Sequence, residues 1–383
     1  MSASPSTDAP VAVVGGGVVG AAVAHALARR GIPSVLLEAE AELARGASGA
    51  NSGILHTGFD SAPGELETEL ILRSAELRPG ILEELELPVI ACGGRIEPRE
   101  DGDAARIEGI AAKAGQNSVA VAIGEDGALS IPGEAVTDPA GYTAALASSA
   151  AAAGADVRTG ARVDAIEREG ATIAIRLAGG DSVRSTYAVN CAGLHGDEVA
   201  RMVGDESFSI YPRKGELFVF DPPGGVPPEH ILLPIPTKRT KGVLVFPTID
   251  GKVIAGPTAH DQDDKDDWSV RPGAWDEVMD KVVRAYPPLE GAEPIASYAG
   301  LRPAGRGCNY VIGPSASLPE MVNVAAIRST GLSASLGIGE HVTGLLEAAG
   351  LGLGAERALA PGPREADRGP WWRRAASRER VTS

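Results

Sequence analysis

Three glycines near the N-terminus have the spacing that binds a nucleotide diphosphate. Gly15, Gly17 and Gly20 fit the pattern G-x-G-x-x-G. The first glycine of this pattern permits a tight turn, the second lets the backbone approach a pyrophosphate, and the third lets a helix pack closely on a strand. Glu38 lies about 20 residues further on, where an acid hydrogen-bonds ribose hydroxyls. These residues predict a dinucleotide site, and the acid favours FAD or NAD over NADP, which carries a 2′-phosphate.

The sequence around the glycines predicts the strands and the helix that must position them. Residues 11–14 form a short apolar run, which predicts a buried strand of a parallel sheet. The alanine-rich stretch that follows ends at Arg29 and Arg30 before Gly31, as expected for a helix with a basic last turn and a glycine stop. Residues 35–37 predict the second strand. This unit alone does not separate flavin from nicotinamide.

A segment of small and polar residues directly after the second strand bears on that choice. Residues 46–60 read GASGANSGILHTGFD. Ser48, Ser52 and Gly53 are small enough for backbone amides to approach a bulky cofactor, and Asn51 adds a side chain that can hydrogen-bond it. The segment resembles FAD-dependent oxidoreductases of the D-amino-acid-oxidase superfamily. It is most similar to anaerobic-type glycerol-3-phosphate dehydrogenases and L-2-hydroxyglutarate dehydrogenases, which show the pattern S-G-x-N-[SH]-G-x-[IL]-H-x-G.

The resemblance extends over nearly the whole chain except its two ends. Residues 211–220 and 236–267 look like the glycerol-3-phosphate-dehydrogenase branch. Residues 299–303, AGLRP, and 329–335, STGLSAS, resemble the substrate-arginine and flavin-contacting regions of the superfamily.

Two features of the chain depart from these relatives. Many members of the branch carry a cysteine-rich C-terminal extension for an iron–sulfur centre, and the cysteines here are only Cys92, Cys191 and Cys308. We therefore expect electrons to leave by another route. The hydroxyglutarate enzymes tend to have a tyrosine pair where this chain has Phe59 and Asp60, which weakens an assignment to that substrate.

The resemblance implies where FAD would lie. It places the pyrophosphate at the glycine turn, the ribose on Glu38 and the flavin ring near residues 48–53. A helix opening at Gly331, Leu332 and Ser333 would present its N-terminal amides to the flavin. The positions that resemble adenine-side contacts are Val163, Ala192 and Gly193, for which plain strand packing is the alternative interpretation.

The implied reaction is oxidation of an alcohol carbon, with hydride passing to the flavin while a base removes the hydroxyl proton. His56 is the candidate base, because imidazole suits proton transfer near neutrality. Arg302 is the candidate for holding a substrate carboxylate or phosphate through its planar fork of donors. Lys214 and Lys241 could add positive charge to the same pocket, although a solvated lysine is the favoured interpretation of each.

Three other functions stay open at this point. An amino-acid or amine oxidase would remove hydride from a carbon bearing nitrogen. A flavin monooxygenase would need NAD(P)H to reduce the flavin, and the chain has no second unit of strand, glycine turn and helix. A redox-sensing or scaffold protein would keep FAD structurally, and substitution of His56 or Arg302 would leave its activity intact.

Composition limits the partners of the protein. A formal charge of −16 and a pI near 4.9 argue against a nucleic-acid surface, so an anionic small molecule would need a local basic pocket. The cysteines are widely separated, and the acidic run 261–267 lacks the glycine and distal glutamate of an EF-hand, so we expect no metal site. The acceptor could be a quinone, oxygen or a partner protein.

No apolar run of eighteen residues and no signal-peptide pattern occur, which predicts a cytoplasmic protein. Residues 361–383 are low in aliphatic side chains and predict a disordered tail. The alternative is that Trp371, Trp372 and nearby arginines contact a redox partner or the inner face of a membrane.

The pattern of elements predicts an α/β fold, a Rossmann-like FAD-binding domain of the glutathione-reductase type with an inserted antiparallel-sheet substrate domain of the α+β class. A helix should begin at Asp138 and Pro139, another near Trp275, and a last one near Ala334. We expect the FAD-binding domain to be discontinuous, built from residues 1–90, 138–204 and 305–360. The substrate or cap domain would take residues 91–137 and 205–304.

Overall fold

A six-stranded sheet carries the N-terminal nucleotide-binding unit. The computed structural model describes residues 9–236, 242–363 and 368–378. The strand order is β20-β21-β13-β1-β2-β9, and all neighbours are parallel except β20 and β21. The strands are β1 (Val11–Val14), β2 (Ser34–Leu37), β9 (Asp156–Arg158), β13 (Tyr187–Asn190), β20 (Val311–Pro314) and β21 (Met321–Ala325).

The register of this sheet brings three chain segments to one edge. Val14 lies opposite Leu37 on β2 and opposite Asn190 on β13. Because the strands are parallel, the residues that follow them gather at the same carboxyl edge, which is where open α/β sheets bind ligands. The glycine turn, Glu38 and the segment after β13 therefore lie together.

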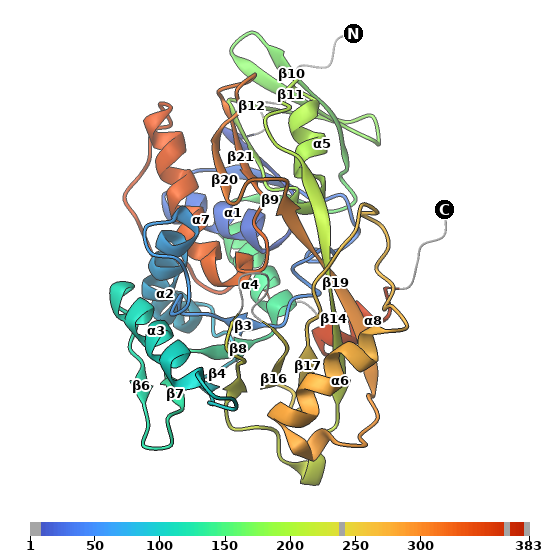
Figure 1. Ribbon diagram of the computed structural model, residues 1–383. Coiled ribbons are helices and arrows are strands. Elements are labelled where there is room, and N and C mark those ends of the chain that lie inside the picture. The colour runs from blue at the N-terminus through green and yellow to red at the C-terminus, as the bar shows by residue number, and fades with distance from the viewer. Residues whose placement is uncertain (1–8, 237–241, 364–367, 379–383) are drawn as a thin grey trace.

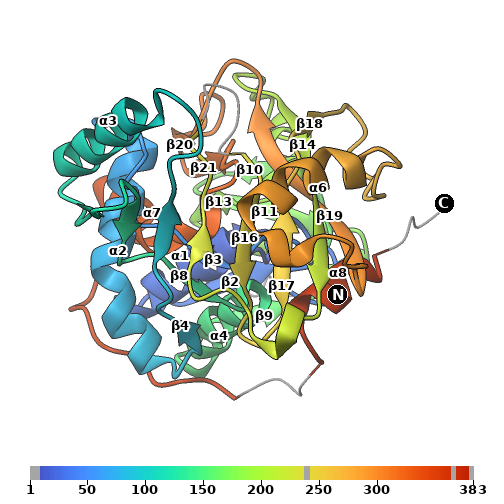
Figure 2. The same cartoon turned by 60° about the horizontal axis from the view of Figure 1, so that its bottom comes forward.

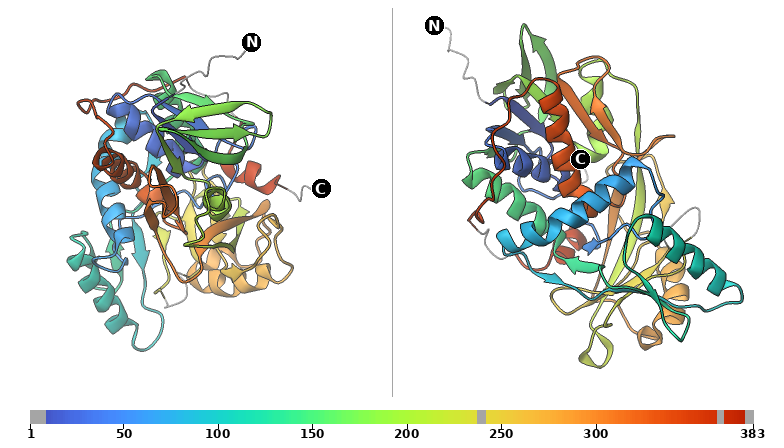
Figure 3. Two further views of the ribbon diagram at one scale, coloured as in Figure 1. Left: turned by 90° about the horizontal axis from the view of Figure 1, so that it is seen from above. Right: turned by 90° about the vertical axis from the view of Figure 1, so that its left-hand side faces the viewer.

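Helices α1, α4 and α7 pack on this sheet, and α2 packs on α7, as the right-hand view of Figure 3 shows. Glycines allow α7 to pack closely: a Cβ on Gly339 would lie 2.6 Å from the Ala22 carbonyl oxygen of α1, and one on Gly337 would collide with the Leu70 carbonyl oxygen of α2. The helices are α1 (Val18–Arg29), α2 (Leu66–Glu84), α4 (Pro139–Ala152) and α7 (Gly331–Ala348).

The expected cap of α4 is confirmed. The Asp138 carboxylate accepts hydrogen bonds from the amides of Ala140 (2.8 Å) and Gly141 (3.0 Å), and Pro139 is the first helical residue. The last long helix begins at Gly331, three residues before the predicted Ala334. Glycine is a poor helix former, so propensity alone places this start too late.

A second, larger sheet forms the lower half of the molecule in Figure 1. It runs β18-β14-β17-β16-β15-β5-β7-β6, and β19 pairs with β14. Its pairs are antiparallel, as expected, except that β15 runs parallel to β5. The strands are β5 (Gly94–Ile96), β6 (Ala122–Ile123), β7 (Leu129–Ile131), β14 (Ile210–Phe220), β15 (Ile231–Leu232), β16 (Leu244–Pro247), β17 (Val253–Gly256), β18 (His260–Asp261) and β19 (Ala296–Gly305).

Helix α6 (Ala274–Ala285) packs against β16 and β17 of this sheet (Figure 2). Helix α3 (Asp103–Gln116) lies near β6 and β7, and α5 (Gly196–Arg201) is a short helix after β13. A separate three-stranded sheet at the top of Figure 1 consists of β10 (Val163–Glu169), β11 (Thr172–Leu177) and β12 (Ser182–Ser185).

A small fourth sheet brings residues of the two predicted domains together. Its order is β3-β8-β4, with β3 at Ile54–Leu55, β8 at Ala135–Thr137 and β4 at Val89–Ile90. Leu55 on β3 lies opposite Ala135 on β8 in antiparallel register. The boundaries of the two domains stay a prediction.

The predicted disordered tail is wrong where the chain forms helix α8 (Trp371–Ala376). This helix packs beside β19, and the side chains of Trp371 and Trp372 are 1% and 2% exposed. Trp371 donates from Nε1 to the Asn51 carbonyl oxygen (3.0 Å), and Trp372 donates from Nε1 to Asp250 Oδ2 (2.9 Å). Because both indoles are buried within the chain, these two tryptophans do not offer a contact surface to a membrane or a partner. Contact through the nearby arginines stays a prediction. Within the described residues, no helix is both long and apolar enough to span a bilayer.

Candidate active site

The glycine turn is shaped by close backbone contacts. A Cβ on Gly15 would collide with the Cys191 carbonyl oxygen, and one on Gly20 would collide with the carbonyl oxygen of Gly15. Gly17 is less enclosed, because a Cβ there would meet only Ser48 Oγ, at 3.1 Å. Gly17 precedes α1 and gives the helix no side-chain cap. The turn therefore leaves a helix N-terminus that can stabilise negative charge.

Glu38 and Ser48 reach this turn from the two ends of one loop. Glu38 Oε2 accepts a hydrogen bond from the Gly16 amide (2.6 Å), and Ser48 Oγ accepts one from the Val18 amide (2.9 Å). Burial raises the pKa of Glu38, while hydrogen bonds from the backbone amides of Glu40 and Gly16 act in the opposite direction. The carboxylate is thus held at the end of β2, and its contact with a ribose stays a prediction.

Asn51 and Ser52, in the same loop between β2 and β3, hydrogen-bond to backbone amides close to them in the chain. Asn51 Oδ1 accepts a hydrogen bond from the Gly53 amide (2.9 Å), and Ser52 Oγ accepts one from the Ile54 amide (3.5 Å). Gly53 has a φ of 80°, and a Cβ there would collide with the Thr137 carbonyl oxygen. These side chains fix the path of the loop into β3.

The start of α7 is tied to the residue that follows β3. Ser333 Oγ accepts a hydrogen bond from the His56 amide (2.8 Å) and donates to the Ile54 carbonyl oxygen (3.3 Å). Leu332 is buried, and Thr330 before Gly331 gives α7 no side-chain cap. A second helix N-terminus without a side-chain cap therefore lies beside His56.

The three predicted adenine-side residues differ in their surroundings. Val163 is buried in a cluster with residues of β1 and β2, which agrees with strand packing. Ala192 lies against Gly15: a Cβ added to Gly15 would be 3.0 Å from the Cα of Ala192. Gly193 has a φ of 57°, and a Cβ there would meet no atom within 4 Å. Ala192 and Gly193 therefore border the open side of the turn.

His56 is paired with an acid that sequence reasoning missed. Its Nδ1 lies 2.7 Å from Oε2 of Glu134, which is fully buried. Antiparallel pairing explains the contact: His56 follows Leu55 on β3, Glu134 precedes Ala135 on β8, and Leu55 and Ala135 are partners. The two residues are 78 positions apart in the chain, and only this register could have indicated the pair.

Arg302 lies on β19, and within the described residues it hydrogen-bonds only to neutral backbone groups. Its guanidinium donates to the carbonyl oxygens of Thr258 (3.3 and 3.4 Å) and Arg213 (3.4 Å), and no salt bridge involves it among the described residues. Burial, and then the charge of Arg213, lowers the pKa of Arg302 to about 10, so it stays charged near neutrality. Its guanidinium occupies the space above Gly215: a Cβ added to Gly215 would lie 2.7 Å from Cζ of Arg302. A charged fork with only neutral partners can bind an anion.

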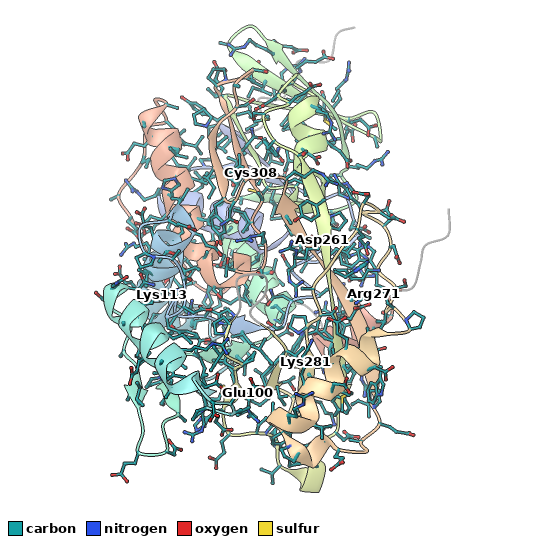
Figure 4. The ribbon with its side chains drawn as sticks, viewed as in Figure 1. Glu100, Lys113, Asp261, Arg271, Lys281 and Cys308 are labelled. Carbon is teal, nitrogen blue, oxygen red and sulfur yellow. The ribbon has the colours of Figure 1, made fainter. Side chains whose placement is uncertain are left out.

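A buried acid supports the strand segment under Arg302. Glu216 accepts hydrogen bonds from the Thr258 hydroxyl (2.6 Å) and from Arg271 Nη2 (2.7 Å). Asp261, which pairs with Arg213, and Arg271 are both labelled in Figure 4, on the side of the molecule where β14 and β19 lie. These interactions hold the Thr258 carbonyl that faces Arg302.

The structure does not bring Lys214 to this site. Arg213 is the cross-strand partner of Arg302, and neighbouring side chains on a strand point to opposite faces, so Lys214 projects from the other face of β14. There its Nζ contacts Asp267 Oδ2 (2.9 Å) and the Ser269 carbonyl oxygen (3.0 Å). The expectation that Lys214 shares the pocket of Arg302 is wrong. Lys241 lies outside the described residues.

Comparison with known proteins agrees with this arrangement. A family model described as FAD dependent oxidoreductase matches residues 10–345. The chain belongs to this family.

Relatives of this FAD dependent oxidoreductase include a glycerol 3-phosphate dehydrogenase of Caloramator mitchellensis, 28% identical over 88% of this chain and 73% of that protein. A glycerol 3-phosphate oxidase of Mycoplasma pneumoniae is 26% identical over 88% and 94% of the two chains. The human mitochondrial L-2-hydroxyglutarate dehydrogenase is 29% identical over 67% and 62%.

Solved structures show the same fold. The dithionite-reduced L-α-glycerophosphate oxidase of Mycoplasma pneumoniae with FAD bound has a TM-score of 0.83 at 24% identity, covering 93% of this chain and 96% of that one. A glycine oxidase of Geobacillus kaustophilus has a TM-score of 0.78 at 25% identity, covering 89% and 95%.

The residues of this chain fit FAD. Helices α1 and α7 begin at the edge where β1, β2 and β13 end, and neither Gly17 before α1 nor Thr330 before α7 caps its helix with a side chain. Gly17 and Gly193 leave room for close approach. Glu38 stands at the end of β2 with its carboxylate directed to the turn. These groups would hold the pyrophosphate, the flavin and the ribose.

Proposed function

We propose that this FAD dependent oxidoreductase oxidises a CH–OH carbon of a small anionic alcohol, with glycerol 3-phosphate as the first candidate and a short 2-hydroxy acid as the second. The observation that carries the proposal is the combination of a carboxylate-held imidazole at His56 and an arginine, Arg302, whose hydrogen-bond partners are all neutral carbonyls. Relatives named for glycerol 3-phosphate support the choice of substrate.

Each residue has one task in this reaction. Arg302 binds the phosphate or carboxylate of the substrate and so orients its hydroxyl carbon. His56 accepts the hydroxyl proton, which makes hydride departure from the carbon easier. The hydrogen bond from the His56 amide to Ser333 fixes the imidazole relative to the start of α7. FAD, when bound, supplies the acceptor of the hydride.

Anaerobic reduction of the flavin tests this function. Purified protein should be yellow, and glycerol 3-phosphate should bleach it. His56→Ala should slow the reduction about 100-fold or more, and Arg302→Ala should weaken substrate binding while FAD stays bound. A protein that cannot be reconstituted with FAD would contradict the proposal.

The same experiment separates the other candidates. Bleaching by glycine, proline or other amino acids, and not by hydroxy anions, would favour amine oxidation, which the fold of a glycine oxidase also supports. Rapid bleaching by NADPH alone would favour a monooxygenase. No reduction by any of these compounds, with activity unaffected by substitution of His56 and Arg302, would favour a structural role for FAD.

The electron acceptor is tested on the reduced protein. Mixing with oxygen, a soluble quinone or cell extract should show which one restores the yellow colour fastest. A membrane quinone would require contact with a lipid surface, and cosedimentation with vesicles measures that contact.

A further inference from the structure

The carboxylate of Glu134 has a fixed orientation. Its Oε1 accepts two hydrogen bonds from Thr57, one from the backbone amide (2.7 Å) and one from the hydroxyl (2.9 Å). Its Oε2 faces Nδ1 of His56 at 2.7 Å. Because a backbone amide can only donate, the atom at the Oε1 position must be an acceptor. The two oxygens are therefore not interchangeable.

The backbone of His56 is held as firmly as its ring. Its amide donates to Ser333 Oγ, and its carbonyl accepts a hydrogen bond from Arg78 Nη2 (3.1 Å), which also donates to the Ser333 carbonyl oxygen (3.1 Å). The side chain of His56 is only 12% exposed. With the ring placed in this way and Nδ1 turned to Glu134, Nε2 is the ring nitrogen left to meet a substrate.

We propose that Glu134 is a positioning residue that holds His56 in the tautomer with the proton on Nδ1, which leaves Nε2 as the atom that accepts the substrate's hydroxyl proton. This inference rests on the proposed function. The O–H bond breaks as its proton passes to Nε2, and bound FAD would supply the acceptor for the hydride that leaves the carbon, so that the alcohol would become a carbonyl. The imidazolium that forms faces the Glu134 carboxylate, which stabilises its charge.

Glu134→Gln tests the tautomer directly. The Thr57 amide keeps the glutamine oxygen at the Oε1 position, so the NH₂ group takes the place of Oε2 and donates to Nδ1. The imidazole proton must then move to Nε2, which can no longer accept a proton. We expect the anaerobic rate constant of flavin reduction to fall about 10²- to 10⁴-fold, with little change in substrate Kd or bound FAD.

Nitrogen NMR gives a readout that does not depend on turnover. The chain has six histidines, so ¹⁵N-histidine labelling of the oxidised, FAD-loaded protein is tractable, and His56→Gln assigns the signal. We expect a protonated Nδ1 and an unprotonated Nε2 in the parent protein, and the reverse in Glu134→Gln. Thr57→Val is the matched control: it removes the hydroxyl bond, keeps the backbone amide donor, and should preserve both the tautomer and most of the rate.

The outcomes separate this inference from the proposed function. If no substrate reduces the flavin of the parent protein, the proposed function fails, and the NMR signals still test the role of Glu134. If Oε2 carried a proton, Glu134→Gln would reproduce that donor and leave both tautomer and rate unchanged, which would overturn the inference. A parent protein with the proton on Nε2 would also overturn it, and that measurement requires no variant to fold.

Discussion

The absence of a side chain on Gly215 makes room for the guanidinium of Arg302. The guanidinium of Arg302 occupies the space that a Cβ on Gly215 would fill. Gly215 lies in a strand and shows no positive φ, so the need for glycine at this position comes from Arg302 and not from the backbone. The position of the Arg302 guanidinium, the proposed anion-binding group, therefore depends on two residues.

Gly215→Ala should weaken substrate binding without unfolding the protein. Displacing the guanidinium would weaken a charged hydrogen bond worth about 1.5–3 kcal/mol, which corresponds to a rise in substrate Kd of roughly 10- to 150-fold. The rate of flavin reduction at saturating substrate should fall less. Gly313→Ala, at a strand glycine whose Cβ would meet no atom within 4 Å, is the control. An unchanged Kd in Gly215→Ala would argue against Arg302 as the substrate ligand.

His25 makes the stability of the protein depend on pH. Its side chain is 1% exposed on α1, Nε2 has no hydrogen-bond partner, and burial, with a smaller effect of Arg29, lowers the pKa of His25 from 6.5 to about 4. The unfolded chain therefore takes up the proton first as the pH falls. The free energy of unfolding should decrease between about pH 6.5 and pH 4 and be insensitive to His25 above that range.

Urea unfolding as a function of pH measures this effect. His25→Leu should flatten the dependence over that interval, while His260→Gln, at an exposed residue, should keep the slope of the parent protein. Equal slopes in all three proteins would show that His25 does not contribute.

At the scale of elements, α8 joins two parts of the chain that the sequence keeps apart. Trp371 donates to the loop between β2 and β3, and Trp372 donates to Asp250 in the turn between β16 and β17. Arg378, just beyond the helix, lies over the ring of Trp268 at 3.7 Å. The helix thus fixes the loop between β2 and β3, the predicted FAD-binding loop, against the large sheet.

The two indoles should have separable effects. Trp371→Phe keeps the aromatic ring and removes the hydrogen bond to Asn51, so the loop should loosen and the Kd for FAD should rise by up to about tenfold, the equivalent of a net hydrogen bond of 0.5–1.5 kcal/mol. Trp372→Phe removes a bond outside the loop, and should lower thermal stability with little effect on FAD. Fluorescence of released FAD measures the difference, and equal FAD affinity in the two variants would refute it.

An element or contact could be predicted when a short stretch of sequence determines it, and could not when it depends on distant parts of the chain. The glycine turn, the Asp138 cap and the first two strands, predicted at residues 11–14 and 35–37, follow from periodicity and capping within short windows, and they form as expected. The pairing of Glu134 with His56 depends on a cross-strand register, and the misplacement of Lys214 depends on which face of β14 it occupies. Neither can be read from one segment. Helix α8 was missed because its burial comes from distant surfaces, while its own flanks are polar.

At the scale of the whole molecule, the site is assembled from separate parts of the chain. The turn after β1, the loop after β2, the segment after β13 and the start of α7 meet at one edge, where each would contribute groups for a ligand. The chain also carries a formal charge of −16, so local groups would have to hold an anionic cofactor and the proposed anionic substrate against an unfavourable overall charge. Ligand binding should consequently stabilise the native state as a unit.

FAD should raise the thermal unfolding midpoint of the apoprotein in a concentration-dependent way. A ligand that binds only the folded state adds about 2.7 kcal/mol at a free concentration of 100 times its Kd. FMN lacks the adenosine half that Glu38 and the residues after β13 would hold, so it should give a smaller shift at the same concentration. Glu38→Ala should reduce the FAD shift and leave the FMN shift unchanged, because only FAD carries the ribose that this carboxylate would bind. Equal shifts with FAD and FMN would mean that the adenosine half is not bound at this edge of the sheet.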